Sequence, residues 1–359
     1  MTLLARASLD QVQPYKPGKP IEELRRELGL KEIIKLASNE NANGPSPKAL
    51  KAVQKVLHQL HRYPDADCFL LKKKLASRLG VKESQIVVGN GSDEIILLAL
   101  RSFVDAGEEV IVASPTFLIY EIASRVVGAK VVQIPLSNFR YDLKRMKEAV
   151  SAKTKIIFIA NPDNPTGTYV KREEVEEFLE GLPKKTIVFF DEAYFEFVQE
   201  RDYPDTRKYL SKHPIILTRS FSKAYGLAGL RVGYGLSTSE IADYLNRVRE
   251  PFNVNALAQA AALAALEDRA HLEKTRRMVR EGKRFLYRSF DELGLRYIPS
   301  QANFILVNVG DGKAVYEKLL KFGVIVRDME AWKLEGFIRV TIGKREENKR
   351  LLRVLKKIL

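Results

Sequence analysis

Cysteine and histidine are scarce in this 359-residue sequence, and their scarcity excludes several kinds of site. Cys68 is the only cysteine, so the chain cannot form an internal disulfide or a metal site built from several thiolates. The four histidines, at positions 58, 61, 213 and 271, show no HExxH or other ligand spacing. We therefore expect neither a disulfide framework nor a metal centre.

Long apolar runs are missing as well. The longest, around residues 256–266, is rich in alanine and well short of a membrane span. The N-terminus lacks an apolar segment followed by a small-residue cleavage site, which is the pattern of a secretory signal. These features predict a cytoplasmic enzyme that has no membrane partner.

Positive charge is in excess, but it is not clustered. The 60 Lys and Arg residues against 45 Asp and Glu residues give a formal net charge of +15. Such an excess can indicate nucleic-acid binding, yet the sequence has no basic run interleaved with aromatics and no nucleic-acid-binding motif. Basic residues alternate with glutamate, as in residues 171–174, which favours solvated helix faces and attraction of phosphorylated metabolites. We expect small-molecule partners; a nucleic-acid-binding protein is the alternative from another class.

The order of apolar and helical segments predicts an α/β fold. Short apolar segments at 86–88, 110–113, 130–134, 155–160, 186–190, 215–219 and 232–235 alternate with helical segments. This pattern is typical of buried strands in a mostly parallel central sheet with helices on both faces. A long helical region at 256–294 then precedes strands at 303–307, 324–327 and 337–341, an α+β pattern.

These patterns predict a large domain and a smaller α+β domain. We assign residues 39–253 to the large domain and residues 254–359 to the C-terminal part of the small domain. Residues 1–38 are expected to form a proline-punctuated arm and the start of the small domain.

The segment at residues 220–233 is the most informative stretch for function. Lys223 lies between the hydroxyls of Ser220 and Ser222 and a run of small residues, and Arg231 follows eight residues later. Small residues let a ligand approach the backbone, while hydroxyls and an arginine can hold a phosphate. The lysine amine can form a Schiff base with an aldehyde. The alternative is a glycine-rich turn that carries an exposed lysine.

Other polar residues follow the ends of the predicted strands. Gly91, Ser92 and Asp93 form a glycine turn that opens a helix, a layout that presents backbone N–H groups to an anion. Glu94 stands where a dinucleotide fingerprint needs its third glycine, so a nicotinamide site is not expected. Further candidates after strand ends are Phe117, Asn164, Asp191 and Tyr194. Ligands in such sheets gather outside the carboxyl ends of the strands, so we expect these residues to form one site.

Taken together, these residues resemble the fold-type I pyridoxal-phosphate (PLP) aminotransferases of class I/II. The matching motifs are NPxNPTG at 161–167, DEAY at 191–194, SxSKAxGLAGLRVGY at 220–234 and RVTIG at 339–343. The resemblance covers nearly the whole chain. It implies a PLP cofactor and the PLP fold-type I large domain.

Finer motifs resemble the histidinol-phosphate aminotransferase branch of this family. They are the arm at 14–20, the loop at 39–47, RYPD at 62–65, GNGSDE at 89–94, PSxANF at 299–304 and VRD at 326–328. The loop departs from the branch pattern at Ala42 and Asn43, where a proline and an aromatic are usual. This departure concerns substrate scope, so an aromatic amino acid aminotransferase and a threonine-phosphate-type decarboxylase remain alternatives.

The resemblance also implies a role for each residue. Lys223 would form the Schiff base and move the proton, Asp191 would keep the pyridine nitrogen protonated, and Phe117 would stack on the ring. The ring 3′-oxygen would be bound by Asn164 and Tyr194. The cofactor phosphate would be held by Gly91, Ser92, Asp93, Ser220, Ser222, Arg231 and, from the partner subunit of a homodimer, Tyr63. Substrate anions would be bound by Tyr15, Arg327 and Arg339. The implied reaction is transamination between histidinol phosphate and 2-oxoglutarate in histidine biosynthesis.

Overall fold

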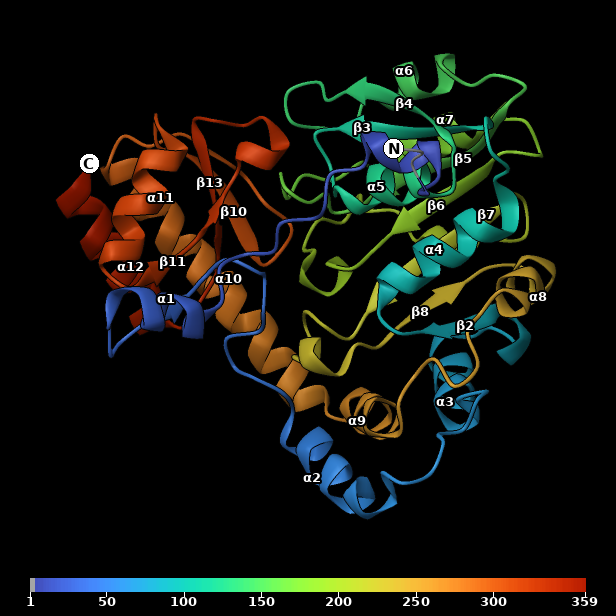
Figure 1. The fold of residues 1–359 in the computed structure, drawn as a ribbon, viewed down its shortest axis with the longest axis horizontal. Coiled ribbons are helices and arrows are strands. Elements are labelled where there is room, and N and C mark those ends of the chain that lie inside the picture. The colour runs from blue at the N-terminus through green and yellow to red at the C-terminus, as the bar shows by residue number, and fades with distance from the viewer. Residues whose placement is uncertain (1–3) are drawn as a thin grey trace.

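A seven-stranded sheet forms the centre of the larger part of the molecule (Figure 1). The computed structural model describes residues 4–359, and the sheet order is β2-β8-β7-β6-β5-β3-β4. In this sheet β8 runs opposite to the other six strands, which are parallel to one another. The strands are β2 (Ile86–Gly89), β3 (Glu109–Ser114), β4 (Lys130–Pro135), β5 (Thr154–Ala160), β6 (Ile187–Asp191), β7 (Ile215–Ser220) and β8 (Gly233–Leu236). The predicted mostly parallel sheet is confirmed.

The central strands are apolar on both faces because helices cover both faces. The side chains of Ile156–Ile159 in β5 are fully buried, as expected of a parallel strand inside two helical layers. Helices α4 (Ser92–Phe103) and α5 (Ile119–Val126) link β2 to β3 and β3 to β4, and pack on one face of the sheet. Helices α6 (Leu143–Glu148) and α7 (Arg172–Leu179) link β4 to β5 and β5 to β6, in the opposite direction along the sheet, so right-handed crossovers place them on the other face. The remaining helices of the larger part are α2 (Pro47–Val56), α3 (Phe69–Leu79), α8 (Ser239–Arg247) and α9 (Ala256–Leu266).

The smaller part draws on both ends of the chain. Strand β1 (Ile34–Lys35) pairs in parallel with β11 (Val324–Ile325). A four-stranded antiparallel sheet has the order β12-β13-β10-β9. Its strands are β9 (Tyr297–Ile298), β10 (Phe304–Asn308), β12 (Arg327–Asp328) and β13 (Phe337–Thr341), and its helices are α1 (Ile21–Leu28), α10 (Arg269–Glu292), α11 (Gly312–Lys321) and α12 (Arg345–Ile358). This is the α+β architecture expected for this part of the chain.

Two expected elements are divided in the structure. The helical region at 256–294 consists of α9 and α10, and Asp268 caps the second by accepting a hydrogen bond from the His271 N–H. The strand expected at 324–327 splits at Val326 into β11 and β12, which belong to different sheets. The apolar side chains of α9 join the larger hydrophobic core, while those of α10 join the smaller one. The boundaries at residues 38 and 253 stay a prediction.

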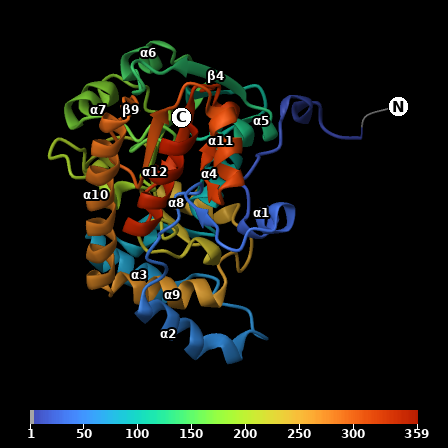
Figure 2. The ribbon, with the colours of Figure 1, turned by 90° about the vertical axis from the view of Figure 1, so that its left-hand side faces the viewer.

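The N-terminal arm runs along the outside of the molecule and reaches away from it near residue 4 (Figure 2). A short 3₁₀ turn, Ala7–Gln11, interrupts the extended chain. Further along, the carbonyl oxygen of Lys16 accepts a hydrogen bond from Arg327, so the arm is tied to β12.

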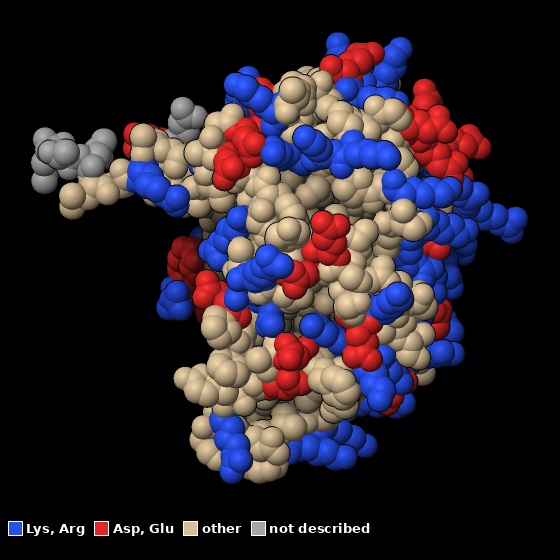
Figure 3. Space-filling view, turned by 90° about the vertical axis from the view of Figure 1, so that its right-hand side faces the viewer, with Lys and Arg blue, Asp and Glu red and all other residues tan. Residues whose placement is uncertain are grey.

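Charged side chains of both signs are interspersed over the face drawn in Figure 3. Ion pairs between described residues are common across the molecule; Lys130–Glu109 and Arg140–Glu174 are examples. Within residues 4–359 no helix is long and apolar enough to cross a membrane.

Candidate active site

A cavity of about 270 Å³ opens at the carboxyl ends of the parallel strands, between the two parts of the molecule. Its walls come from the loops after β2, β3, β5, β6 and β7, from the N-terminal arm, and from β12 and β13. The predicted site residues that line it are Tyr15, Ser92, Asp93, Phe117, Asn164, Asp191, Tyr194, Ser220, Ser222, Lys223, Arg231, Arg327 and Arg339. The structure thus brings together residues more than 300 positions apart in the sequence.

Lys223 lies in the loop after β7 and its amine reaches into the cavity. The Nζ atom donates a hydrogen bond of 3.2 Å to the carbonyl oxygen of Ser38 and lies 5.8 Å from the centre of the Tyr194 ring. Burial, helped by the positive charge of Arg339, lowers the pKa of Lys223 to about 8. A substantial fraction of this amine is therefore neutral near physiological pH, which suits a nucleophile or a base.

Asp191, the last residue of β6, is a buried carboxylate with neutral partners only. Tyr120 donates to Oδ2 at 2.7 Å, while the Ala193 N–H and the Thr218 hydroxyl donate to Oδ1 at 3.1 and 3.3 Å. Burial raises the pKa of Asp191 to about 6, against the effect of these hydrogen bonds. A cationic ligand atom beside Asp191 would stabilise its ionised form.

Asn164 and Tyr194 are each held by a hydrogen bond from a distant residue, Arg339 of β13 and Asn39 of the loop after β1. Arg339 donates a hydrogen bond to Oδ1 of Asn164, which leaves the Asn164 amide NH₂ as the group that can donate to a ligand. The hydroxyl of Tyr194 accepts a hydrogen bond of 3.0 Å from Asn39, and burial raises the pKa of Tyr194 to about 12. Tyr194 is therefore a protonated donor at neutral pH.

The start of α4 and the loop after β7 form a cradle for an anion. Arg231 bonds the Ser222 hydroxyl at 3.3 Å and Oδ2 of Asp93 at 3.3 Å. A Cβ on Gly91 would lie 2.5 Å from Nη2 of Arg231, and a Cβ on Gly233 would lie 2.6 Å from the Ser92 nitrogen. These glycines bring the helix N-terminus and the arginine to one point, where N–H groups and positive charge favour an anion. Gly91 does not line the cavity itself.

Arg327 and Arg339 form the opposite wall and face each other across the β12–β13 pair. Both are buried, and the Nε atom of each has no hydrogen-bond partner within residues 4–359. Their remaining bonds go to uncharged atoms, since Arg327 donates to the Lys16 carbonyl and Arg339 to the Ala37 carbonyl and Asn164. Buried cations need a counter-charge, so these arginines fit an anionic ligand.

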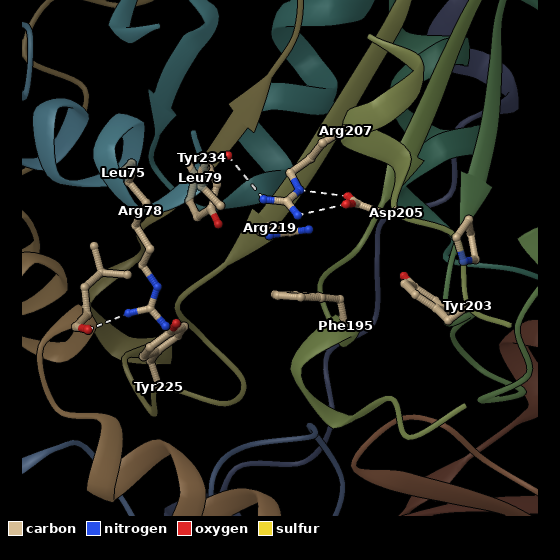
Figure 4. Close-up of a pocket in the computed structure, with 12 residues that line it drawn as sticks. Leu75, Arg78, Leu79, Phe195, Tyr203, Asp205, Arg207, Arg219, Tyr225 and Tyr234 are labelled. Carbon is tan, nitrogen blue, oxygen red and sulfur yellow. Dashed lines mark hydrogen bonds and ion pairs between the residues drawn. The ribbon is translucent and has the colours of Figure 1, made fainter. Parts of the chain in front are cut away.

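A second arginine-rich cavity, of about 410 Å³, provides a contrast (Figure 4). Arg207 forms a two-pronged pair with Asp205 at 2.8 and 2.9 Å. Arg219 bonds Glu192 at 2.9 Å and lies 3.6 Å from the centre of the Phe195 ring. The charges of these two arginines are neutralised within the protein. The cavity around Lys223, whose arginines Arg327 and Arg339 bond only uncharged atoms, therefore needs an anionic ligand more than this second cavity does.

Tyr63 is the one predicted site residue that lies outside this arrangement. It is 83% exposed and stacks on Phe252 with ring centres 4.6 Å apart. The contact of Tyr63 with a cofactor in a partner subunit stays a prediction.

The loop that carries Ala42 and Asn43 packs on the residues after Lys223, because Asn41 donates to the Ala224 carbonyl at 2.9 Å. Neither Ala42 nor Asn43 lines the cavity.

Several residues that shape the site were not predicted from the sequence. Tyr120 and Thr218 bond Asp191, Asn39 bonds Tyr194, and Ser38 bonds Lys223. Asn39 has a left-handed backbone (φ 57°), which asparagine tolerates better than most residues, and its place in a turn-rich loop was a usable signal. No group of three or more possible metal ligands occurs in the described part of the chain.

Comparisons with known proteins place this geometry in context. The family described as "Aminotransferase class I and II" matches residues 31–355. The histidinol-phosphate aminotransferase of Moorella thermoacetica is 47% identical, with 99% of this chain and 92% of that protein covered. Histidinol-phosphate aminotransferase 1 of Nitrosococcus oceani is 48% identical, with 99% and 97% covered. The crystal structure of histidinol-phosphate aminotransferase from Sinorhizobium meliloti in complex with pyridoxal-5′-phosphate superposes with a TM-score of 0.91 at 29% identity, covering 100% of this chain and 99% of that one.

Proposed function

We propose that this chain, which belongs to the class I and II aminotransferase family, transfers the amino group of L-histidinol phosphate to 2-oxoglutarate. The products are imidazole-acetol phosphate and glutamate, and the step belongs to histidine biosynthesis. The observation that carries the proposal is the pair of buried arginines, which face Lys223 across one cavity and have no acidic partner among residues 4–359. The two relatives described above, which span nearly the whole chain, support the same assignment.

The cofactor is pyridoxal 5′-phosphate, and three features of the cavity fit it. The cradle formed by Ser92, Ser222 and Arg231 suits the phosphate group. Asp191 lies deep in the cavity with neutral partners only and suits a protonated pyridine nitrogen. Lys223 offers an amine of which a substantial fraction is neutral near physiological pH, and the neutral form can attack the aldehyde. When bound, the cofactor supplies an electron-accepting ring that stabilises negative charge on the amine-bearing carbon of the substrate.

The residues around the ring would then act by hydrogen bonding and charge. Asp191 holds the proton on the pyridine nitrogen, while the Asn164 amide and the Tyr194 hydroxyl donate to the ring 3′-oxygen. Phe117 covers a ring face; its own ring meets Tyr120 edge-on with centres 5.5 Å apart. Arg339 reaches this network through Asn164, so substrate binding and ring electronics share one side chain.

Lys223 would move the proton during the reaction. With cofactor and substrate bound, the Lys223 amine would be the group placed to remove the proton from the amine-bearing carbon of the substrate and to hold it for return. A pKa of about 8 lets this amine both accept and release a proton near neutral pH.

The two arginines explain why the enzyme can use two different substrates. Histidinol phosphate carries one phosphate group, while glutamate and 2-oxoglutarate carry two carboxylates. Arg327 with Tyr15 suits the distal anion, and Arg339 suits the carboxylate nearer the cofactor. Both substrates can therefore supply the counter-charge that the buried guanidinium groups lack.

The active unit that we propose is a homodimer in the cytoplasm. Exposed apolar side chains lie on α2, α3 and the segment between them, where a soluble surface is usually polar; they are Leu50, Leu57, Leu60, Tyr63, Phe69 and Leu70, with Phe252 beside Tyr63. A partner subunit would cover them, and its own Tyr63 would reach this chain's cofactor phosphate. Sedimentation of the purified protein at micromolar concentration as a monomer would contradict this.

The experiment that tests the function is a substrate panel on the purified holoenzyme. We expect turnover of histidinol phosphate that requires 2-oxoglutarate, and much slower turnover of phenylalanine and tyrosine. Faster turnover of the aromatic amino acids would favour the aromatic aminotransferase, and CO₂ release from threonine phosphate without a keto acid would favour the decarboxylase. In Arg327→Gln, kcat/KM for histidinol phosphate should fall by a factor of about 100, as expected for removing one arm of a charged pair.

The matched control for Arg327→Gln is Arg207→Gln in the second cavity. Arg207 is paired with Asp205 away from Lys223, so its loss should leave KM for histidinol phosphate close to that of the unaltered enzyme. Equal losses in both variants would mean that the effect of Arg327 is general destabilisation.

A further inference from the structure

Trp332, the only tryptophan in the chain, lies against both substrate-facing arginines. The centre of its ring is 5.0 Å from Cζ of Arg327 and 5.9 Å from Cζ of Arg339. The residue ends a short 3₁₀ turn, Glu330–Trp332, and is 3% exposed. One aromatic side chain thus contacts the two cations that the proposed function assigns to substrate binding.

The arginine pair needs such a contact because the two charges repel. Arg327 and Arg339 are direct cross-strand partners, a position where like charges are destabilising. Neither forms an ion pair with Asp or Glu anywhere from residue 4 to the C-terminus. A ring face attracts a desolvated cation by up to about 2 kcal/mol, so the Trp332 ring offsets part of the repulsion. It also limits the directions in which each guanidinium can point.

The position of the ring is fixed from the other side of the cavity. The indole N–H donates a hydrogen bond of 2.8 Å to the carbonyl oxygen of Thr116, next to the ring-stacking candidate Phe117. The Thr116 hydroxyl in turn donates to the buried carboxyl of Asp163, the neighbour of Asn164, at 2.7 Å. Trp332 therefore couples the arginines of the smaller part to the two loops that border the cofactor.

We propose that Trp332 is a positioning residue that sets Arg327 and Arg339 for the anionic groups of both substrates. The inference rests on the proposed function, because it assumes that these arginines bind substrate anions. Trp332 acts through the arginines and does not line the cavity around Lys223. Its effect should therefore appear in substrate affinity and not in the loading of the cofactor.

The test uses two substitutions in the holoenzyme, Trp332→Phe and Trp332→Leu. Phenylalanine keeps a ring face but loses the N–H bond, and leucine loses both. We expect KM for histidinol phosphate and for 2-oxoglutarate to rise by a factor of a few in Trp332→Phe and by about tenfold or more in Trp332→Leu, with a smaller change in kcat. The visible absorption of the bound cofactor should be unchanged in both variants.

Phe139→Leu is the matched control. Phe139 packs in the same apolar cluster as Trp332 and contacts Phe337. In the described part of the chain its ring makes no cation–π contact with Arg327 or Arg339. A rise in KM in Phe139→Leu equal to that in Trp332→Leu would overturn the proposal, because the effect would then be one of packing. An unchanged KM in both Trp332 variants would overturn it as well.

The single tryptophan gives a second readout that does not need turnover. Titration of the holoenzyme with inorganic phosphate should change the Trp332 fluorescence in a saturable way, and Arg327→Gln should abolish the change. A wild-type enzyme that fails to turn over histidinol phosphate but shows this change would reject the proposed substrate and keep the role of Trp332. The absence of any change at saturating phosphate would reject the role of Trp332, whatever the substrate.

Discussion

Tyr120 donates a hydrogen bond of 2.7 Å from its phenol to Oδ2 of Asp191. The Tyr120 ring stacks on Phe158 with ring centres 4.7 Å apart and is 1% exposed, so the phenol is held in one place. A hydrogen bond to a carboxylate stabilises its ionised form, and this bond opposes the burial that raises the pKa of Asp191. Tyr120 therefore helps to keep Asp191 charged at neutral pH, the state that pairs with a protonated pyridine.

The first prediction concerns this bond. Tyr120→Phe should weaken PLP binding by about tenfold to a hundredfold, because a hydrogen bond to a charged group contributes about 1.5–3 kcal/mol. It should also raise the pKa of Asp191 further. As the pH falls, the variant should therefore lose PLP affinity at a higher pH than the unaltered protein does. Spectroscopic titration of the apoenzyme with PLP between pH 5 and pH 8 measures both effects.

Tyr141→Phe serves as the control for Tyr120→Phe. Its buried hydroxyl bonds Thr116 and the Ala160 N–H and does not bond Asp191. If Tyr141→Phe weakened PLP binding as much as Tyr120→Phe did, the hydrogen bond to Asp191 would not be the cause.

The second prediction concerns the amine of Lys223. Only the neutral amine can attack the PLP aldehyde, and burial lowers the pKa of Lys223 to about 8. The rate of covalent PLP attachment should therefore rise about tenfold per pH unit below pH 8 and level off above it. Stopped-flow absorbance on the apoenzyme gives this profile.

Lys283 tests whether the profile belongs to Lys223. Burial lowers the pKa of Lys283, in α10, to about 8 as well, but its amine donates to the carbonyl oxygen of Ser300 and does not line the cavity around Lys223. Lys283→Met should keep the profile, while Lys223→Ala should bind PLP only noncovalently. Covalent attachment in Lys223→Ala would remove Lys223 from its proposed role.

The third prediction compares two glycines that have similar positive φ angles. Gly91 (φ 83°) would place a Cβ 2.5 Å from Arg231, whereas Gly107 (φ 85°) has no heavy atom within 4 Å of the added Cβ. Alanine at either position should cost about 1–3 kcal/mol of unfolding free energy, because an L side chain rarely adopts a positive φ. Only Gly91→Ala should also displace Arg231 and weaken PLP binding. Equal PLP affinity in the two variants would show that Arg231 does not bind the cofactor phosphate.

The sequence was sufficient to predict the strands of the central sheet and the residues that follow them. Buried parallel strands are short and apolar, and the polar residues at their carboxyl ends stand out against them, as Asp191 does after 186–190. Lys223 was recognisable because its small neighbours serve no purpose in an exposed loop. These are local signals, and the sheet topology converts them into one site.

The supporting contacts could not be predicted because they join distant segments. Tyr120 lies in α5 and reads as an ordinary helical aromatic, yet its hydroxyl meets a carboxylate 71 positions later. The contact between Trp332 and the arginines depends on the pairing of β12 with β13 and on a turn at 330–332, and nothing in the local sequence indicates it. Tertiary packing decides such contacts, so they became visible only in the fold.

The last prediction concerns Glu196, whose buried carboxyl lies in the turn after Tyr194. Its Oε2 atom has no hydrogen-bond partner among the described residues, and burial raises the pKa of Glu196 to about 8 against the opposing charge of Arg219. An unfolded glutamate ionises near pH 4.3, so between about pH 4 and pH 8 the unfolded state binds fewer protons than the folded state. Glu196 should therefore make the protein less stable as the pH rises through this window.

Glu196→Gln removes this titration. Relative to the unaltered protein, the free energy of unfolding of the variant should increase by about 1.36 kcal/mol per pH unit between pH 5 and pH 8, and then level off. Comparing one variant at two pH values cancels any constant cost of burying the amide. Urea unfolding at pH 5, 6.5, 8 and 9 measures the difference, and Glu281→Gln, at an exposed position of α10, should show no such trend. A constant difference across the series would mean that Glu196 is already ionised in the folded protein, with Arg219 as its counter-charge.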